Sequence, residues 1–486
     1  MNNDAIATAD ALQVLAFMGD LSMGQPVDHS KRVAWLSRRM AQELGADEAF
    51  CRGAGQVALL RWAGCSANAT EVARLISDDV GGRSAMLALR PDDIKLLVSP
   101  NLVERRIAEI SAIHCEVSVL IAATLGLAPM VIEALAGIFE CWDGSGLPAG
   151  VAGDAIPLPV LLVKLAGDLE IFNREYGLAG ALDLLRQRAN ASYPRCLVDM
   201  LCRAAADWLR ELETQEETVA DEQADADAVP VSLSLVADAI DLKLPWLTGY
   251  SRAVAQLAAT MAARLEMTPA AQARVRRAGL LHGLGRAAIP NAVWNRPAPF
   301  SLADWEQARL SPYWTARAAS QVKSLAQEAE IASTVYERLD GSGYFRAARS
   351  ASTPLECRIL PLAASWLALQ APRPWRPALN AGAAIEHLQR QTALGRFDQR
   401  VLAVLDSALP PSAGLAASIE APGGILSPRE LEVLRCIAQG DSNKEAARKL
   451  GVSPSTIRTH MENTFRKLEC KSRAAATLKA SLLGLL

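Results

Sequence analysis

Hydrophobic residues along this chain recur mainly at helical spacing, three or four positions apart, with polar and charged residues between them. Hydrophobic residues make up 51% of the composition and aromatic residues only 5%. A stripe of this period is typical of a helix that buries one face against a core. The chain of 486 residues is long enough for three domains. We therefore expect an all-α protein with several packed domains.

The helical pattern is clearest in the last sixty residues. Ser427 precedes a predicted helix and Glu430 follows three residues later, which is the signature of a capping box. An apolar stripe then runs through Leu431, Val433, Leu434 and Ile437. Gly440 is expected to end this helix.

Two further helices are predicted after that turn. Asn443 can cap a short helix over residues 444–450, and Gly451 can end it. Pro454 then stands in the first turn of a third helix, where its missing N–H costs nothing. Two helices joined by a short glycine turn are typical of a helix-turn-helix, which places the second one in the DNA major groove.

The third helix carries the side chains that we expect to read DNA bases. Arg458 suits the O6 and N7 atoms of guanine, Thr459 can contact a thymine methyl group, and Glu462 can accept from a cytosine amine. The flanking side chains predicted to contact phosphates are Lys444, Ser455, Thr456, Lys467 and Arg473. Double-stranded DNA is therefore the first partner that the sequence predicts.

The charge distribution agrees with that prediction. From Ile425 onward there are 11 Lys and Arg residues against 6 Asp and Glu, a net charge of +5. The whole chain carries −3, so the remainder carries −8. A basic module attached to an acidic body is what DNA binding requires electrostatically.

This C-terminal segment resembles the LuxR/FixJ-type helix-turn-helix. The positions that match the family pattern are Leu426, Arg429, Glu430, Glu432, Val433, Leu434, Gly440, Asn443, Lys444, Glu445, Ala447, Leu450, Ser453, Thr456, His460, Lys467 and Leu468. The resemblance implies a four-helix domain that acts as a homodimer on two half-sites. It also implies that the fourth helix, over residues 472–483, is the pairing surface.

The rest of the chain contains a long internal repeat. Residues 140–172 align without a gap with residues 337–369, and both begin a few residues before an Asp-Gly-Ser-Gly sequence. Farther upstream, His29 and its neighbours align with Tyr250 and its neighbours. The first copy holds about 24 extra residues near positions 66–91. Such a repeat indicates two similar domains in tandem.

Both copies resemble HD-GYP domains, which are helical, metal-dependent phosphodiesterases that hydrolyse cyclic di-GMP. The similarity is carried by the segment that begins at Arg276, by residues 371–379 and by the Asp-Gly-Ser-Gly sequences. It covers most of residues 20–205 and 240–405. The resemblance implies two tandem HD-type helical domains followed by the four-helix LuxR-type domain.

Family enzymes bind their metal ions through His and Asp side chains, and most of those positions differ here. The first copy keeps His29 and His114, and the second keeps only His282. The family's His-Asp pair begins at Arg61 in the first copy, and its last-helix aspartate falls on Gly167. We therefore expect remnant histidines, no metal or other cofactor, no catalytic residue, and a chain that is not an enzyme.

The Asp-Gly-Ser-Gly loops are kept in both copies. Asp143 and Asp340 are each expected to accept a hydrogen bond from a backbone N–H two residues later, which would form a turn. Folding is then a sufficient reason for keeping the loops. The alternative is that loops of this type, with Asp143 in the first copy and Asp340 and Tyr344 in the second, still bind a ligand or a partner protein.

Two segments of biased composition divide the chain. Residues 211–229 are strongly acidic, and residues 408–424 are rich in Ala, Gly, Pro and Ser, so both are predicted to be linkers. The predicted domains are HD-GYP-like over 1–210, HD-GYP-like over 230–407, and LuxR-type over 425–486.

The chain shows no sign of export or of membrane insertion. The N-terminus lacks the basic flank and apolar core of a signal peptide, and no apolar run reaches the roughly 18–20 residues that span a bilayer. The nine cysteines contain no CxxC pair, so we expect reduced core thiols. A cytoplasmic protein without a membrane partner is predicted.

Together these patterns indicate a cytoplasmic transcription regulator with an HD-like sensory or dimerising body. Three hypotheses for that body stay open. It could sense a small-molecule effector such as a nucleotide, it could serve as a scaffold for another signalling protein, or it could be an active phosphodiesterase or phosphohydrolase.

Overall fold

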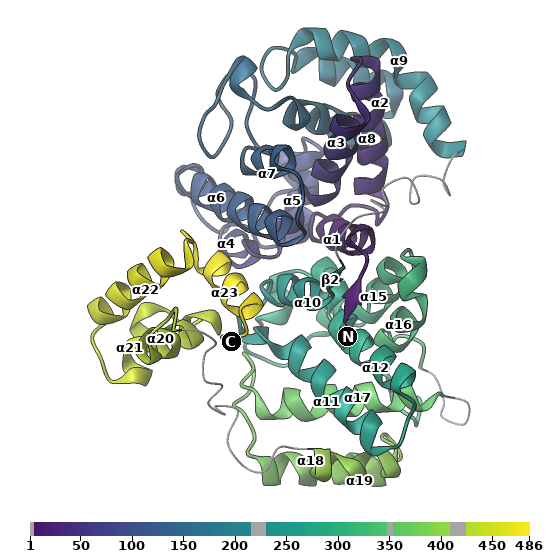
Figure 1. Cartoon of the computed structure of the whole chain (residues 1–486), viewed down its shortest axis with the longest axis vertical. Coiled ribbons are helices and arrows are strands. Elements are labelled where there is room, and N and C mark those ends of the chain that lie inside the picture. The colour runs from purple at the N-terminus through teal and green to yellow at the C-terminus, as the bar shows by residue number, and fades with distance from the viewer. Residues whose placement is uncertain (1–3, 215–229, 348–352, 409–423) are drawn as a thin grey trace. The chain divides into compact units, whose positions relative to one another are not determined.

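The computed structural model describes residues 4–214, 230–347, 353–408 and 424–486. The regular secondary structure of the described residues is almost entirely helical, as the spacing of apolar residues predicts (Figure 1). Two short strands, β1 (Ala5–Ile6) and β2 (Val231–Ser232), pair in a two-stranded sheet. The chain divides into an N-terminal unit, Ala7–Val231, and a C-terminal unit, Ser232–Leu486 together with the segment that ends at Ile6.

The N-terminal unit is a helical bundle in which α2 packs against α3 and α8. Its core contains fully buried Phe17, Leu36 and Phe172. Its helices are α1 (Thr8–Ser22), α2 (His29–Glu43), α3 (Glu48–Leu60), α4 (Ala69–Ala73), α5 (Asp79–Leu87), α6 (Pro100–Thr124), α7 (Pro129–Ala136), α8 (Leu158–Gln187) and α9 (Arg195–Thr214). The 3-10 turns are η1 (Ala63–Cys65), η2 (Pro91–Asp93) and η3 (Gly153–Ala155).

The C-terminal unit begins with a second bundle, in which α11 packs against α12 and α17. Its helices are α10 (Ser234–Asp241), α11 (Tyr250–Arg264), α12 (Pro269–Leu281), α13 (Asn291–Trp294), α14 (Leu302–Ala308), α15 (Ser311–Ala319), α16 (Ala326–Ala332), α17 (Leu355–Gln370), α18 (Ala381–Ala393) and α19 (Gln399–Ala408). The 3-10 turns are η5 (Pro245–Leu247), η6 (Leu284–Ala288) and η7 (Lys323–Leu325).

Positions aligned by the repeat play the same local roles in the two bundles. Asp47 caps α3 by accepting from the Phe50 N–H, and Thr268, 221 positions later, caps α12 by accepting from the Ala271 N–H. Aspartates near the ends of α1 and α10 accept from the backbone N–H and hydroxyl of a serine in the next helix; the pairs are Asp20 with Ser30 and Asp241 with Ser251.

The C-terminal unit also contains the four short helices that the sequence predicts near its end. They are α20 (Pro428–Ala438), α21 (Asn443–Leu450), α22 (Pro454–Leu468) and α23 (Arg473–Leu482). Helix α22 packs against α20, α21 and α23. Its buried residues are Ile457, Met461, Thr464 and Leu468, and Phe465 is only partly buried.

The predicted linkers and the predicted cysteine environments need correction. Helix α9 continues to Thr214, so the first four residues of the predicted acidic linker are helical, and Leu212 is buried. The remainder of that linker up to residue 229, and residues 409–423 of the second linker, lie outside the described residues. Cys196, expected in the core, is exposed, whereas Cys115 is buried.

One helix in the described part of the chain, α6, is long and apolar enough to cross a membrane. Seven of its residues are buried within the N-terminal unit, including His114, Cys115 and Ile121. A core helix of a soluble protein has the same length and composition, so this single helix is weak evidence for a membrane span.

Candidate functional site

The helix-turn-helix is held by side-chain caps at the start of each of its helices. The capping box of Ser427 and Glu430 at α20 is present as predicted. At α21 the cap is Ser442, which forms a capping box with Glu445, and Asn443 is the first helical residue. Asn443 was predicted as the cap because it is also a capping residue type and stands next to Ser442. Its side-chain oxygen instead accepts from Arg473 at 3.0 Å.

Helix α22 presents the predicted base-reading residues to solvent. Gly451 ends α21 in the left-handed conformation, and Ser453 caps α22. Ser455, Arg458, Thr459 and Glu462 are all exposed. Arg458 donates from Nε to Oε1 of Glu462 at 2.9 Å, one helical turn away. The side chains of this pair are 76% and 61% exposed, so the ion pair orients the guanidinium without removing it from solvent.

The predicted phosphate contacts differ in how free they are. Lys444 is exposed on α21, whereas the Lys467 ammonium lies 2.7 Å from Oε2 of Glu430. Lys467 therefore links α22 to the capping box of α20, and its ammonium is already engaged by a carboxylate instead of being available to a phosphate. Thr456 is only partly buried, and its hydroxyl lies 2.8 Å from that of Ser453.

In the N-terminal unit His29 is completely buried, and both of its ring nitrogens face protein groups. Nδ1 lies 2.5 Å from Oε2 of Glu170, and Nε2 faces the guanidinium of Arg61. The ring also stacks on Trp62 with 4.9 Å between centroids. Burial and the nearby Arg61 lower the pKa of His29 and Glu170 raises it, with a net result of about 4. A neutral ring that donates from Nδ1 and accepts at Nε2 fits this arrangement.

Arg61 places a permanent positive charge at the position aligned with the family's metal-binding histidine. Its guanidinium lies over Trp62 at 4.0 Å and faces His29. Gly167, aligned with the family's last aspartate, makes room for it, because a Cβ there would lie 2.3 Å from Nη1 of Arg61. Burial alone would raise the pKa of Glu170, but His29 and the arginines around it hold that pKa at about 2.

His114 is buried nearby and is equally occupied. Its Nε2 donates to the backbone oxygen of Arg61 at 2.7 Å, and Nδ1 faces the Cys65 sulfur at 3.6 Å. The ring packs against Phe139, with centroids 4.7 Å apart. Burial lowers the pKa of His114 to about 4.

The C-terminal unit has an arginine beside its histidine as well. His282 donates from Nδ1 to the Gly279 oxygen at 2.6 Å, and its Nε2 accepts from Nη2 of Arg286 at 2.8 Å. Arg286 also lies over the ring of Tyr250, at 5.3 Å. Tyr250 takes the aligned place of His29, and its hydroxyl donates to the Ala364 oxygen at 2.8 Å.

These surroundings do not fit a metal ion. The nitrogens of His29, His114 and His282 face protein groups, and a guanidinium approaches two of the three rings. The described residues include no group of three or more His, Cys, Asp or Glu side chains that could hold a metal. A cation beside Arg61 or Arg286 would meet a like charge. We therefore assign no metal-dependent step to either centre.

The two Asp-Gly-Ser-Gly loops form the expected turns. Asp143 accepts from the Ser145 N–H at 2.9 Å, and Asp340 accepts from the Ser342 N–H at 2.9 Å. The last glycine of each loop lies against backbone, because a Cβ on Gly146 or Gly343 would come within 2.5 Å of it.

A buried glutamate before each loop holds the chain that follows, a role that the sequence comparison did not identify. Glu140 accepts from the N–H groups of Ala149 and Val151, and Glu337 accepts from that of Arg346. Both glutamates align in the repeat, which is the signal that could have identified them. Tyr344, expected to face a ligand or partner, instead stacks on Tyr336 with centroids 5.1 Å apart.

Comparison with known families agrees with two of the sequence resemblances. Residues 234–401 match the family model described as "HD domain", and residues 424–480 match "Bacterial regulatory proteins, luxR family". The nitrate/nitrite response regulator protein NarP of Escherichia coli is 48% identical over 59 residues, which are 12% of this chain and 27% of NarP. The C-terminal module is thus of the LuxR type. The HD match covers the second repeat, and a tandem pair of degenerate HD domains is not established by it.

Relatives that cover most of the chain are phosphodiesterases. The 3′3′-cGAMP-specific phosphodiesterase 3 of Vibrio cholerae is 24% identical over 426 residues, which are 80% of this chain and 92% of that protein. A crystal structure of a cyclic GMP-AMP-specific phosphodiesterase from V. cholerae superposes with a TM-score of 0.61 and 21% identity, over 84% of this chain and 99% of that one. The second comparison establishes the HD-type helical fold.

These relatives contradict the prediction that the chain is not an enzyme. That prediction rested on missing metal ligands, position by position, whereas the similarity extends over nearly the whole length of a phosphodiesterase. Loss of individual ligands in an alignment does not reveal what other groups a fold supplies, so it was insufficient ground for excluding activity.

Proposed function

We propose that this chain is a transcription regulator that binds double-stranded DNA through α22 and whose HD body responds to a small-molecule or protein effector. The observation that carries the proposal is the exposed row of Arg458, Thr459 and Glu462 on a capped helix, within the segment that matches the LuxR family. The net charge of +5 from residue 425 onward supports it.

The geometry of α22 supports reading of DNA sequence as well as contact with its backbone. Arg458 and Glu462 lie one turn apart on the exposed face, so a guanine and a cytosine on neighbouring base pairs are suitable partners. Lys444, on α21, supplies a charge at the edge of this face and is suited to a phosphate.

Genome-wide occupancy by the intact protein tests the DNA-binding proposal. Arg458→Ala should relax base preference by about 1–3 kcal/mol, and Lys444→Ala should weaken binding evenly across sequences. Arg435→Ala, on α20, is the control because it removes one positive charge from the same domain outside α21, α22 and the predicted pairing helix α23. Peaks that persist unchanged in the Arg458→Ala and Lys444→Ala double variant would contradict the proposal.

The effector class that the relatives favour is a cyclic dinucleotide. The body matches a protein named for its action on 3′3′-cGAMP over 92% of that protein's length. Such a ligand can alter DNA binding only if it binds one arrangement of the protein better than another. Calorimetry of the full chain with 3′3′-cGAMP and cyclic di-GMP tests this part, and absence of heat with both would remove cyclic dinucleotides as effectors.

Hydrolysis of a cyclic dinucleotide is the second candidate function, and the same relative favours it. The purified chain would be incubated with 3′3′-cGAMP, with and without added Mn²⁺, and the linear dinucleotide measured by chromatography. This candidate function predicts product that accumulates in proportion to protein concentration. Absence of product under conditions in which a known phosphodiesterase consumes the substrate would remove this candidate. Bound metal, measured after purification, would show separately whether any site holds an ion.

A further inference from the structure

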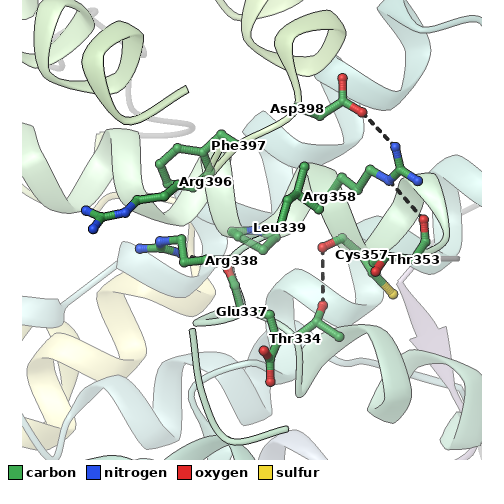
Figure 2. Close-up of a pocket in the computed structure, with 11 residues that line it drawn as sticks. Thr334, Glu337, Arg338, Leu339, Thr353, Cys357, Arg358, Arg396, Phe397 and Asp398 are labelled. Atoms are coloured by element: carbon green, nitrogen blue, oxygen red, sulfur yellow. Dashed lines mark hydrogen bonds and ion pairs between the residues drawn. The ribbon is translucent and has the colours of Figure 1, made fainter. Parts of the chain in front are cut away.

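The segment that matches the HD family contains a polar pocket that shares no lining residue with the His282 centre. It lies where the loop after α16, the start of α17 and the turn before α19 meet (Figure 2). The space not filled by protein atoms here is about 380 Å³, a volume that includes open solvent. Three arginines line it: Arg338, Arg358 and Arg396.

One of these arginines is already neutralised. Arg358 donates from Nη1 to Oδ2 of Asp398 at 2.9 Å and from Nε to the Thr353 oxygen at 2.9 Å. Figure 2 shows both contacts at one end of the pocket. Arg358 therefore belongs to the wall and is not the group that would attract a ligand.

The carboxylate of Glu337 is also engaged elsewhere. It accepts from the Arg346 N–H at 2.7 Å, and in Figure 2 it points away from the guanidinium of Arg338. With Arg358 and Glu337 accounted for, the remaining charges of the pocket are Arg338 and Arg396.

Arg338 and Arg396 extend to the same side of the pocket in Figure 2. Arg338 donates to the backbone oxygen of Glu337 at 3.0 Å and lies over the Phe397 ring at 4.6 Å. No salt bridge joins Arg338 to a carboxylate within the described ranges. Among the described residues Arg396 has one carboxylate partner, Asp340, at 3.4 Å from Nε, and its Nη1 donates to Oε1 of Gln391 at 2.6 Å, so Nη2 is the nitrogen of Arg396 that neither contact uses. Burial lowers the pKa of Arg338, and the positive charge of Arg396 lowers it further.

We propose that this pocket binds a phosphate group between Arg338 and Arg396. Two guanidinium groups can each present a pair of N–H donors to a tetrahedral dianion, and the dianion would relieve the repulsion between them. The phosphate is that of free inorganic phosphate or of a nucleotide 5′-monophosphate. The inference is independent of the proposed DNA binding and of cyclic-dinucleotide hydrolysis.

Occupation of this pocket would reach the Asp-Gly-Ser-Gly loop. Arg396 contacts Asp340, which is the first residue of that loop. The Asp340 carboxylate accepts from the Ser342 N–H and so forms the turn. A phosphate competes with Asp340 for the same guanidinium, so binding would loosen the contact between the pocket and residues 340–343.

Calorimetric titration of the full-length protein tests the site. Inorganic phosphate is titrated at constant ionic strength, with chloride as the reference anion, and parallel titrations use AMP and adenosine. We expect saturable phosphate binding. Arg338→Gln and Arg396→Gln should each weaken it at least tenfold. The matched control is Arg390→Gln on α18, whose side chain is 66% exposed and 3.8 Å from Glu386; this variant should bind like the wild type.

Each outcome bears on the proposal. The proposal is overturned if phosphate gives no more binding heat than chloride. It is also overturned if Arg390→Gln weakens phosphate binding as much as Arg338→Gln and Arg396→Gln do. Tighter binding of AMP than of phosphate, with none for adenosine, would identify a nucleotide as the source, and equal affinity would identify free phosphate. If Arg338→Gln does not fold, Arg338→Lys retains the charge without the planar fork, and wild-type affinity in both Arg338→Lys and Arg396→Gln would contradict the two-arginine site.

Discussion

Single residues in this protein show how buried histidines can be kept neutral by their partners. His29 and His282 each donate from Nδ1 and accept at Nε2 from an arginine. Protonation of His282 would place a second positive charge beside Arg286 in a buried site. Burial, reinforced by Arg286, therefore lowers the pKa of His282 to about 3.

His282 should make the protein less stable in mild acid. In the unfolded chain a histidine has a pKa of about 6.5, whereas in the folded protein the pKa of His282 is about 3. Between these two pH values His282 is therefore protonated in the unfolded state and neutral in the folded state, which favours unfolding. Its contribution is therefore complete above pH 6.5 and falls as the pH decreases. Between pH 7 and pH 5 the loss should be about 2 kcal/mol.

Urea unfolding of the wild type and of His282→Gln at both pH values measures this contribution. Burial raises the pKa of Asp20 to about 8 and that of Asp241 to about 7, which acts in the opposite direction, but both proteins share these groups. The stability advantage of the wild type should shrink by about 2 kcal/mol at pH 5. A gap that is the same at both pH values would mean that the pKa of His282 is the same in the folded and the unfolded protein, which would contradict the prediction.

At the scale of elements, the start of α21 distinguishes two neighbouring capping residues. Ser442 accepts from the Glu445 N–H, and the Glu445 carboxylate accepts from the Ser442 N–H. Ser442→Ala should therefore destabilise the DNA-binding module by about 1 kcal/mol. Asn443→Ala should cost less, because it removes only an exposed contact with Arg473. Thermal unfolding of the two variants compares them, and a larger loss for Asn443→Ala would reverse the assignment.

A second element-scale feature is that each of the 3-10 turns η1 and η6 lies close against a helix of its own bundle, η1 against α6 and η6 against α15. Cβ atoms on Gly64 and Gly285 would lie 2.2 and 1.9 Å from the backbone oxygens of His114 and Ser311, respectively. These glycines align in the repeat, so both bundles depend on the same close approach.

Gly285→Ala should therefore destabilise the C-terminal unit by about 1–3 kcal/mol, because backbone must move to admit the methyl group. Gly382→Ala is the matched control, since its Cβ would meet nothing closer than 3.5 Å. Chemical denaturation should show the control unchanged or slightly more stable, as expected for Gly→Ala in a helix. Equal stability of both variants would show that η6 tolerates displacement.

At the scale of the whole molecule, we expect a homodimer that binds two half-sites. Sedimentation should give about twice the monomer mass of 51.9 kDa. An operator with half-sites one helical turn apart should bind more tightly than one with half-sites half a turn apart, because only the first presents both to the same face of DNA. A monomer with equal affinity for both operators would contradict this expectation.

An HD-type helical fold and a LuxR-type helix-turn-helix occur in one chain here, and their functions were not equally accessible from sequence. The helix-turn-helix was accessible from sequence, because caps, glycine turns and apolar spacing are local signals that act within a few residues. Whether the body is an enzyme was not accessible in this way. Similarity over most of the chain corrected an exclusion that had been based on a few aligned ligand positions.

The sequence by itself determined the helical fold class, the DNA-binding module and the internal repeat, since each depends on periodicity or on nearby residues. Only the tertiary structure decided which groups surround the buried histidines His29 and His282. Arg61 faces His29 across 32 positions and fits because Gly167, over 100 positions later, lacks a side chain. Arg338 and Arg396 meet at one pocket through the packing of α17 and α19. Such contacts depend on long-range packing, which no local pattern encodes.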